Sequence, residues 1–478
     1  MSKTLTVFCT VLLQMTFLQT FAHAGDIDWT GTYRVEGVKV ENAEANSEEK
    51  NKQYILHHLV LKPKITAYDG LTIQGRFDIL NSGGYPNSQL GQFFGSGVGG
   101  GTNNNSTNNN VLSDNQQADM IAVNELYLTF VQEFGVLTVG RAPLQFGLGM
   151  SYNAGTGAFD HWFDNRDMVA YKMSFGNLTF TPMMAKVVEG ELGYEDDIDD
   201  FMLQVMYENP DTELKLGAMY RIRHAGRYGN SAPGTPVFGD GAATSPASAG
   251  FKGEYLNLFF SRWVGESFKI GMEASTQKGE TGVISSLGTV SMDAYGVALE
   301  IDWVPKASSF HAGLKAGVAS GDDANTVNNY EGFMFDRNYD VAFLLFNHPL
   351  SRYDLFRTAG NRPQATGVET SYPSFRADEE TISNVMYFAP HFKYKWSDTF
   401  DSQLGLTYAQ LNSDPIQGAS VDKAVGFEVD ITLNYKPYEN VQWVNRFGVF
   451  APGAAFEAGG QNDPKTVYGL ETKAAITF

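Results

Sequence analysis

The last twelve residues, Val467-Tyr-Gly-Leu-Glu-Thr-Lys-Ala-Ala-Ile-Thr-Phe478, decide the fold that this sequence predicts. Counting back from Phe478, Ile476, Ala474, Thr472, Leu470 and Tyr468 occupy every second position, whereas Glu471 and Lys473 point the other way. Side chains alternate between the two faces of a β-strand, so this period of two predicts a strand with one apolar and one polar face.

The composition favours a β-structure over a helical one. The 478 residues include 34 Phe, 23 Tyr and 50 Gly, and the mean hydropathy is slightly negative. A helical membrane protein needs runs of about 20 apolar residues, and no such run follows the first 24 positions. A bundle of membrane-spanning helices is therefore excluded.

The first 24 residues are predicted to be a signal peptide. Lys3 precedes the apolar run 7–13, and Ala22-His23-Ala24 forms a cleavage site, so the mature chain is expected to start at Gly25 as one domain, 25–478. Cys9, the only cysteine, would leave with the peptide, which excludes disulfides, thiolate metal sites and cysteine nucleophiles. Removal of Lys3 takes the net charge from -20 to -21, and such an acidic exported chain is a poor nucleic-acid binder.

The remainder divides into alternating segments of roughly ten residues, the pattern of a transmembrane antiparallel β-barrel. We expect an all-β fold of about 18 strands. The predicted strands are 29–40, 53–68, 71–79, 122–132, 136–141, 168–176, 178–188, 201–208, 214–223, 255–264, 268–278, 290–303, 310–319, 383–396, 400–411, 425–436, 441–450 and 466–478.

The connections between these segments alternate in length. The long ones, all odd-numbered, are 41–52, 81–118, 143–166, 224–250 and 320–382, and the even-numbered ones are short. With both termini in the periplasm, the long loops are extracellular and the short turns periplasmic, as in bacterial barrels. A soluble sandwich or propeller predicts no such alternation. The Gly- and Asn-rich stretch 81–118 is read as a mobile surface loop, because no strand-then-helix context supports a phosphate site.

Charged residues within the predicted strands fall opposite apolar ones. In 425–436, Phe427 and Ile431 oppose Glu428 and Asp430. A lysine or arginine facing lipid at mid-depth would cost about 2–4 kcal/mol, so the charged faces are expected to line the lumen. Aromatic residues near the turns suit the two membrane interfaces; they are Trp29, Trp263, Trp303, Trp396 and Tyr435.

A strand that ends on a terminal Phe resembles the closing strand of bacterial outer-membrane β-barrels, in which the insertion machinery reads the terminal and alternating residues. The resemblance implies that Tyr468 and Phe478 form a membrane-insertion signal. The segments 426–435 and 447–453 resemble the closing strands of the alginate-export family and related porin-like barrels. Gly140-Arg141-Ala-Pro-Leu-Gln-Phe-Gly-Leu-Gly149 is similar to their segment in which an arginine leads into an inward-folding loop.

Charged residues of both signs are the candidates for the pore lining or constriction. The alginate exporter has an arginine-dense constriction, and the acids here depart from that pattern. The charges either pair with one another to hold the lumen together or create a transverse field that selects solutes. The candidates are Arg34, Arg76, Glu125, Arg141, Arg221, Arg223, Glu273, Glu300, Asp302, Lys393, Glu428, Asp430 and Arg446.

Two long connections, 143–166 and 320–382, are rich in aromatic residues and arginines. Solvated loops rarely carry so many aromatic residues, so at least one is expected to fold into the pore; the alternative is an extracellular cap. The inward-loop candidates are Trp162, Arg166, Arg337 and Arg352.

No catalytic motif stands out. The histidines of the mature chain are scattered, and no Gly-x-Ser-x-Gly motif is present. The acidic runs 195–200 and 322–323 lack the spacing of a calcium loop. We predict no enzyme, metal or cofactor.

The predicted function is an outer-membrane porin-type channel for passive diffusion of small hydrophilic solutes or ions. The alternatives are a specific channel for acidic saccharides and a loop-plugged structural or adhesive surface protein. The expected partners are the lipid bilayer, the insertion machinery and the solutes. The sequence leaves open whether the protein forms a homo-oligomer.

Overall fold

The computed structural model describes residues 26–45, 51–80, 121–188, 197–225, 251–285, 288–323, 325–326, 328–348, 350, 381–415, 421–460 and 464–478. The predicted signal peptide, the Gly- and Asn-rich loop and Arg352 lie outside these residues.

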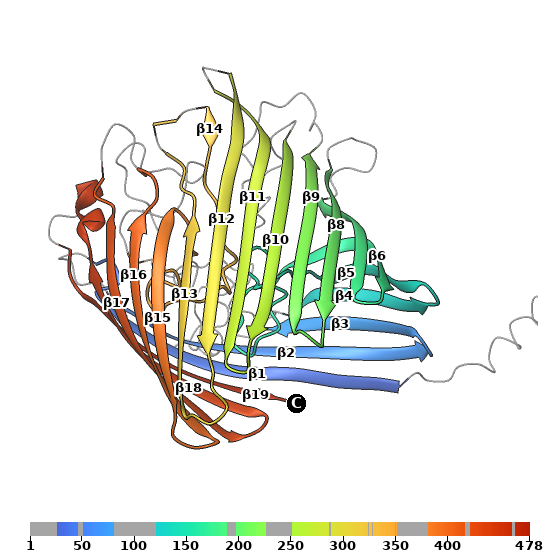
Figure 1. The fold of residues 1–478 in the computed structure, drawn as a ribbon, viewed down its shortest axis with the longest axis horizontal. Coiled ribbons are helices and arrows are strands. Elements are labelled where there is room, and N and C mark those ends of the chain that lie inside the picture. Colours follow the sequence, from blue (N-terminus) through green and yellow to red (C-terminus); the bar gives the residue numbers. More distant parts are fainter. Residues whose placement is uncertain are drawn as a thin grey trace, which may run out of the picture.

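Eighteen long antiparallel strands close into a barrel, as the sequence predicts (Figure 1). Each strand pairs with its neighbours along the chain, and β1 also pairs with β19. The strands are β1 (Asp26–Glu41), β2 (Lys52–Tyr68), β3 (Leu71–Ile79), β4 (Ile121–Gln132), β5 (Gly135–Pro143), β6 (Asn165–Phe175), β7 (Leu178–Val188), β8 (Ile198–Asn209), β9 (Leu214–Ala225), β10 (Lys252–Val264), β11 (Phe268–Ser285), β12 (Gly288–Trp303), β13 (Phe310–Ala319), β15 (Val385–Lys395), β16 (Phe400–Leu411), β17 (Ala424–Tyr438), β18 (Val441–Pro452) and β19 (Val467–Thr477).

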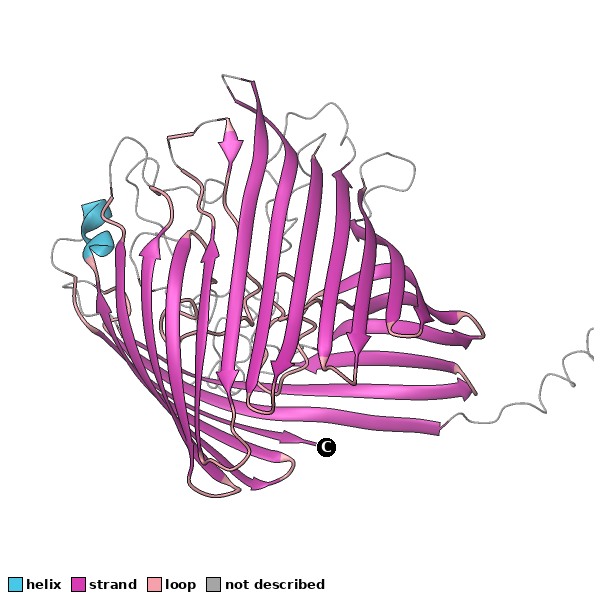
Figure 2. Cartoon of the chain, viewed as in Figure 1, coloured by secondary structure: helices cyan, strands magenta, loops and turns pink. Residues whose placement is uncertain are grey.

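Two short elements were not predicted. The two-residue strand β14 (Asn329–Tyr330) pairs with β12 inside the connection from β13 to β15. The 3₁₀ helix η5 (Ala454–Gly460) follows β18 and is drawn in cyan in Figure 2. Among the described residues, no helix has the length and apolar character needed to cross a membrane.

The two ends of the barrel differ in their connections. At the end where both described termini lie, tight turns join the strands, for example at Asp69-Gly70 and Gly176-Asn177. We call this the short-turn end and the opposite one the long-loop end; in Figure 1 the short turns of β1 to β3 lie at the right and those of β10 to β18 at the bottom. One long-loop connection differs from the prediction: β11 and β12 continue as a paired hairpin to Ser285 and Gly288.

The chain terminus closes the barrel. Thr32 of β1 pairs with Thr477 of β19, and the backbone of Phe478 exchanges two hydrogen bonds with Gly31, of 2.8 and 3.0 Å. A Cβ added to Gly31 would lie 2.6 Å from the Phe478 ring and 2.6 Å from the Val60 carbonyl oxygen. Only a glycine therefore lets the terminal aromatic ring lie over the seam.

We expect Gly31→Ala to destabilise the barrel by about 1–3 kcal/mol, because the backbone oxygen of Val60 has no room to move. Denaturant unfolding of the protein in detergent measures this loss. Gly37→Ala on the same strand is the control, since its added Cβ would meet neighbours only at 3.5 Å or more. Equal stabilities of the two variants would contradict the explanation.

The outer and inner faces are sorted as predicted. On β8, Phe201 and Leu203 point outward and are 50% and 44% exposed, whereas Asp200 and Met202 point inward and are buried. Two stretches of chain, 144–164 and 331–348, enter the barrel and pack their apolar side chains against those of the strands. We call them the first and second inner segments. They position the candidate site.

Candidate functional site

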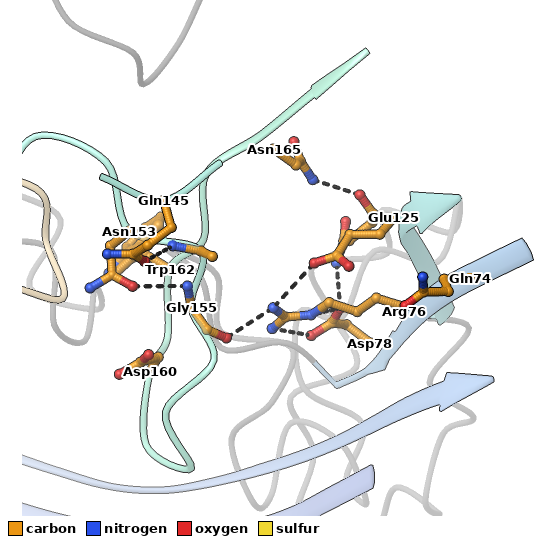
Figure 3. A network of polar contacts seen from close by, with 12 residues as sticks. Gln74, Arg76, Asp78, Glu125, Gln145, Asn153, Gly155, Asp160, Trp162 and Asn165 are labelled. Atoms are coloured by element: carbon orange, nitrogen blue, oxygen red, sulfur yellow. Dashed lines mark hydrogen bonds and ion pairs between the residues drawn. The ribbon is translucent and has the colours of Figure 1, made fainter. Parts of the chain in front are cut away.

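The first inner segment (144–164), which joins β5 to β6, is bound to β3 and β1 on one side of the lumen. Arg76 donates to the Gly155 carbonyl at 3.1 Å and to Asp78 at 2.8 and 3.1 Å (Figure 3). The Arg76 guanidinium also lies 4.3 Å from the centre of the Phe163 ring. Arg34 on β1 donates to the carbonyls of Asp160 and Ala158. These arginines thus bind loop backbone rather than standing free in a pore.

The same segment crosses the lumen and reaches β11. The Glu273 carboxylate accepts hydrogen bonds from the backbone N–H groups of Leu148, Met150 and Ser151, at 2.7, 3.2 and 3.0 Å. Glu273 is fully buried. A buried carboxylate needs partners, and here the partners are three backbone donors that would otherwise be unsatisfied.

Replacing Glu273 by Leu is expected to release this segment from β11, because each buried N–H left without an acceptor costs about 1–3 kcal/mol. Limited proteolysis of the protein in detergent should then cut within 144–164 at least several-fold faster. Glu280→Leu on the same strand is the control, since Glu280 is exposed. Unchanged cleavage in the Glu273 variant would contradict the anchoring role.

The second inner segment (331–348) is bound to β17 in the same manner. Glu428 accepts from the backbone N–H groups of Leu344 and Leu345, at 2.6 and 2.7 Å, and Asp430 accepts from that of Phe343 at 3.1 Å. Leu344, Leu345 and Glu428 are all completely buried. Wall carboxylates therefore hold both inner segments by their backbones.

Asp340 adds an ionic attachment. Its carboxylate lies 2.7 Å from the Arg446 guanidinium on β18, and its carbonyl accepts from Lys315 on β13 at 2.8 Å. Burial alone would raise the pKa of Asp340, but the charges of Arg446, Lys315 and Lys473 outweigh it and lower that pKa to about 2. Asp340 is consequently charged at neutral pH and ties the second segment to β13 and β18.

The two inner segments contact each other inside the barrel. Asp336 donates its backbone N–H to the Met150 carbonyl at 2.7 Å. Asn338 exchanges two hydrogen bonds with the backbone of Trp162, at 2.7 and 3.1 Å. The Arg337 guanidinium lies 4.2 Å from the centre of the Trp162 ring. The segments thus form one partition across the lumen.

Cavities lie on both sides of this partition. The aromatic cavity, of about 170 Å³, is lined by Tyr255 and Gln277 from the long-loop halves of β10 and β11. The polar cavity, of about 410 Å³, is lined by Gln403 and Gln442 next to the short turns. Arg337 lines both cavities. The two cavities therefore adjoin one another at Arg337.

Arginines cluster on the wall beside the aromatic cavity. Asp200 on β8 accepts from Arg223 at 2.8 and 2.7 Å and lies 3.5 Å from Arg221 and 3.8 Å from Arg166. Arg221 also stacks on Tyr255, with its guanidinium 3.6 Å from the ring centre, and lines the cavity. Arg166 also lies 3.7 Å from Asp164 of the first inner segment, so three guanidinium groups and two carboxylates meet at this wall.

Most predicted site residues point into the barrel. Glu300 contacts the Tyr339 hydroxyl at 3.1 Å, Asp302 lies 3.5 Å from His391, and Lys393 pairs with Asp401 at 2.9 Å. Trp162, Arg166 and Arg337 also lie inside. The other inward members are Arg34, Arg76, Glu125, Arg221, Arg223, Glu273, Glu428, Asp430 and Arg446.

The prediction that Arg141 lines the pore is wrong. Its neighbour Ala142 is buried and points inward, and the directly paired Leu126 is 54% exposed on the outside. Arg141 therefore points outward, where it forms a two-pronged ion pair with Asp167 at 2.7 and 2.6 Å. A lipid-facing position is tolerated because the pair lies at the end of β5, next to the long loops.

Several inward residues were missed. Glu36 pairs with Arg34 at 2.8 Å and with His161 at 2.9 Å, and alternation from Arg34 was enough to find it. Asp200 falls one residue before the predicted start of its strand. Asp340 lies in a stretch without periodicity, so nothing in the sequence indicates that it faces Arg446.

An apolar exterior, a closed backbone ladder and a charged interior partitioned by loops define a transmembrane β-barrel protein. In part of the chain, the outward residues are large and exposed while their sequence neighbours are buried and charged. No soluble β-fold needs that arrangement.

Comparison with solved structures gives the same architecture. The chain is similar to OccK9 (OpdG) of Pseudomonas aeruginosa, with a TM-score of 0.51, 10% identity, and coverage of 95% of this chain and 98% of that one. It is also similar to OccK11 (OpdR) of the same organism, with a TM-score of 0.50, 9% identity and coverage of 94% and 96%. No protein-family model and no curated protein matches the sequence. The fold is that of a porin-like outer-membrane β-barrel.

Proposed function

We propose that this protein is an outer-membrane porin-type channel through which small hydrophilic solutes or ions diffuse passively. The observation that carries the proposal is that the aromatic and the polar cavity, each with charged residues in its lining, meet at Arg337 inside a closed barrel. A passive path needs a continuous polar surface and one narrow point that discriminates. The proposal involves no enzymatic step, metal or cofactor.

In this proposal the long-loop end is extracellular and the short-turn end, with both termini, is periplasmic, which matches the usual asymmetry of such barrels. Residues 1–24 act as a cleaved signal peptide. Tyr468 and Phe478 act as the signal read by the insertion machinery, and both are exposed on the outside, 45% and 56%. N-terminal sequencing of the mature protein that finds Gly25 supports the cleavage, and retained Met1 contradicts it.

Conductance across a planar bilayer tests the channel. We expect discrete current steps that scale with salt concentration, because the cavities are lined by polar groups of both signs. A barrel that inserts into the bilayer but carries no current would instead support a loop-plugged structural or adhesive role, since the inner segments are firmly bound to the wall.

A second candidate, a specific channel for acidic saccharides, is favoured by the aromatic cavity. Arg221 and Arg337 line it together with Tyr255 and Trp162. Guanidinium groups bind carboxylates, and aromatic faces offer flat apolar surface for a sugar ring. This candidate is supported over general diffusion if an anionic oligosaccharide blocks the current and a neutral oligosaccharide of equal length does not.

A further inference from the structure

A row of charged residues runs around the outside of the barrel near the long-loop end. Each member is the direct cross-strand partner of the next, from β5 to β11. The row, which we call the charged rim, consists of Arg141, Asp167, Lys186, Asp199, His224, Lys252 and Glu280.

The signs of the rim residues alternate along most of its length. Arg141 pairs with Asp167, and Lys186 contacts both Asp197 and, at 3.7 Å, Asp199. Opposite charges in directly facing cross-strand positions attract one another. The rim is therefore close to neutral as a whole while presenting separate positive and negative groups to whatever surrounds it.

On β6, β7 and β8 the outer surface becomes apolar directly below the rim. The next outward residues towards the short turns, after Asp167, Lys186 and Asp199, are apolar. They are Val169, Met184 and Phe201, which are 52%, 52% and 50% exposed. On β8 the outward residues between Asp199 and Asn209 are Phe201, Leu203, Val205 and Tyr207. On β10 and β11 a second charged pair, Glu254 and Lys278, lies one outward position below the rim, and the apolar surface begins with the next outward residue of β10, Leu256. The rim thus stands directly above the apolar surface on β6 to β8 and is two rows deep on β10 and β11.

The height of that apolar surface matches a membrane. Ten residues separate Asp199 from Asn209, which is about 33 Å along a strand. With the usual tilt of about 40°, this corresponds to a band about 25 Å tall, the height of the lipid-facing band of such barrels. Because charges in hydrocarbon are costly, the rim has to lie at the upper boundary of the hydrocarbon layer.

We propose that the charged rim is a docking surface for the phosphate-bearing lipid headgroups of the membrane, and that it fixes the depth of the barrel. Arg141, Lys186 and Lys252 bind headgroup phosphates, and the intervening acids face the positively charged parts of neighbouring headgroups. The alternating charges of the rim residues match a headgroup layer that itself carries both positive and negative groups. The inference rests on the membrane-barrel part of the proposed function and is independent of whether the lumen conducts.

Nitroxide labels on β9 test the depth. Single cysteines replace His224 in the rim and Ala218 in the apolar band, with Cys9 replaced by Ser, in vesicles of phosphatidylethanolamine and phosphatidylglycerol. We expect the label at 224 to be quenched by a water-soluble nickel chelate and the label at 218 only by oxygen. A label at 224 that behaves like the one at 218 overturns the proposal. A label at 224 that is shielded from both reagents also overturns the proposal, because a second copy of the protein would then cover the rim.

Lipid retention tests the binding. The variant R141Q/K186Q/K252Q is compared with R262Q/K306Q/K436Q, which removes three cations at or near the short turns. By native mass spectrometry we expect the rim variant to retain roughly twofold fewer phospholipids or less, and the control to match the wild type. Equal retention by all three proteins would overturn the proposal even if their conductances differ.

Discussion

Replacing Glu428 by Leu is expected to raise the single-channel conductance several-fold. Glu428 is the sole described acceptor for the backbone N–H groups of Leu344 and Leu345, and leucine offers no acceptor. Two unsatisfied buried donors cost about 2–6 kcal/mol together, so the second inner segment should spend much of its time detached from β17. Because that segment is half of the partition, its detachment widens the path. Planar bilayer recordings give the conductance directly.

Two companion variants make the Glu428 result specific. Glu428→Gln keeps an oxygen acceptor and the side-chain length, so we expect a smaller increase. Glu266→Leu removes an acid whose side chain is 79% exposed in the turn after β10, and should leave the conductance unchanged. A Glu428→Leu protein with normal β-rich circular dichroism and wild-type conductance would show that the segment does not limit the current.

The wall of the barrel was predictable because every strand residue has only two choices of side. Alternation identified all eighteen strands, and for Glu428 and Asp430 it also identified the face. Lipid penalises a wrong choice at almost every outward position, so the pattern is strict. Alternation failed at Arg141, which lies at a strand end. If the charged rim lies among the headgroups, as proposed, a charge there can point either way at little cost.

The interior was far less predictable, since the inner segments obey no period. Aromatic content suggested that 143–166 or 320–382 enters the pore, and both contribute residues to the partition. However, Glu273 recognises backbone N–H groups of Leu148, Met150 and Ser151. Backbone donors are the same in every residue, so no side-chain pattern in the loop predicts which N–H groups Glu273 binds. The partners of a carboxylate that binds backbone become visible only in three dimensions.

Arg337 is expected to set the charge preference of the channel. Of the described residues around the two cavities, Arg337 alone lines both. A unit charge about 4 Å from a passing ion is worth about 1 kcal/mol even in water, which is about a fivefold change in relative permeability. We therefore expect Arg337→Gln to shift the reversal potential under a salt gradient towards cation preference, by about that ratio.

Arg141→Gln is the matched control for Arg337, because it removes the same charge from the same chain but on the outer face of β5. It should leave the reversal potential unchanged, whereas a shift equal to that of Arg337→Gln would mean that the potential reports the net charge of the barrel. Arg337→Lys keeps the charge but loses the planar contact with Trp162. If this variant retains the wild-type selectivity, the charge at the partition is what discriminates; if it behaves like Arg337→Gln, the stacked geometry on Trp162 is required as well.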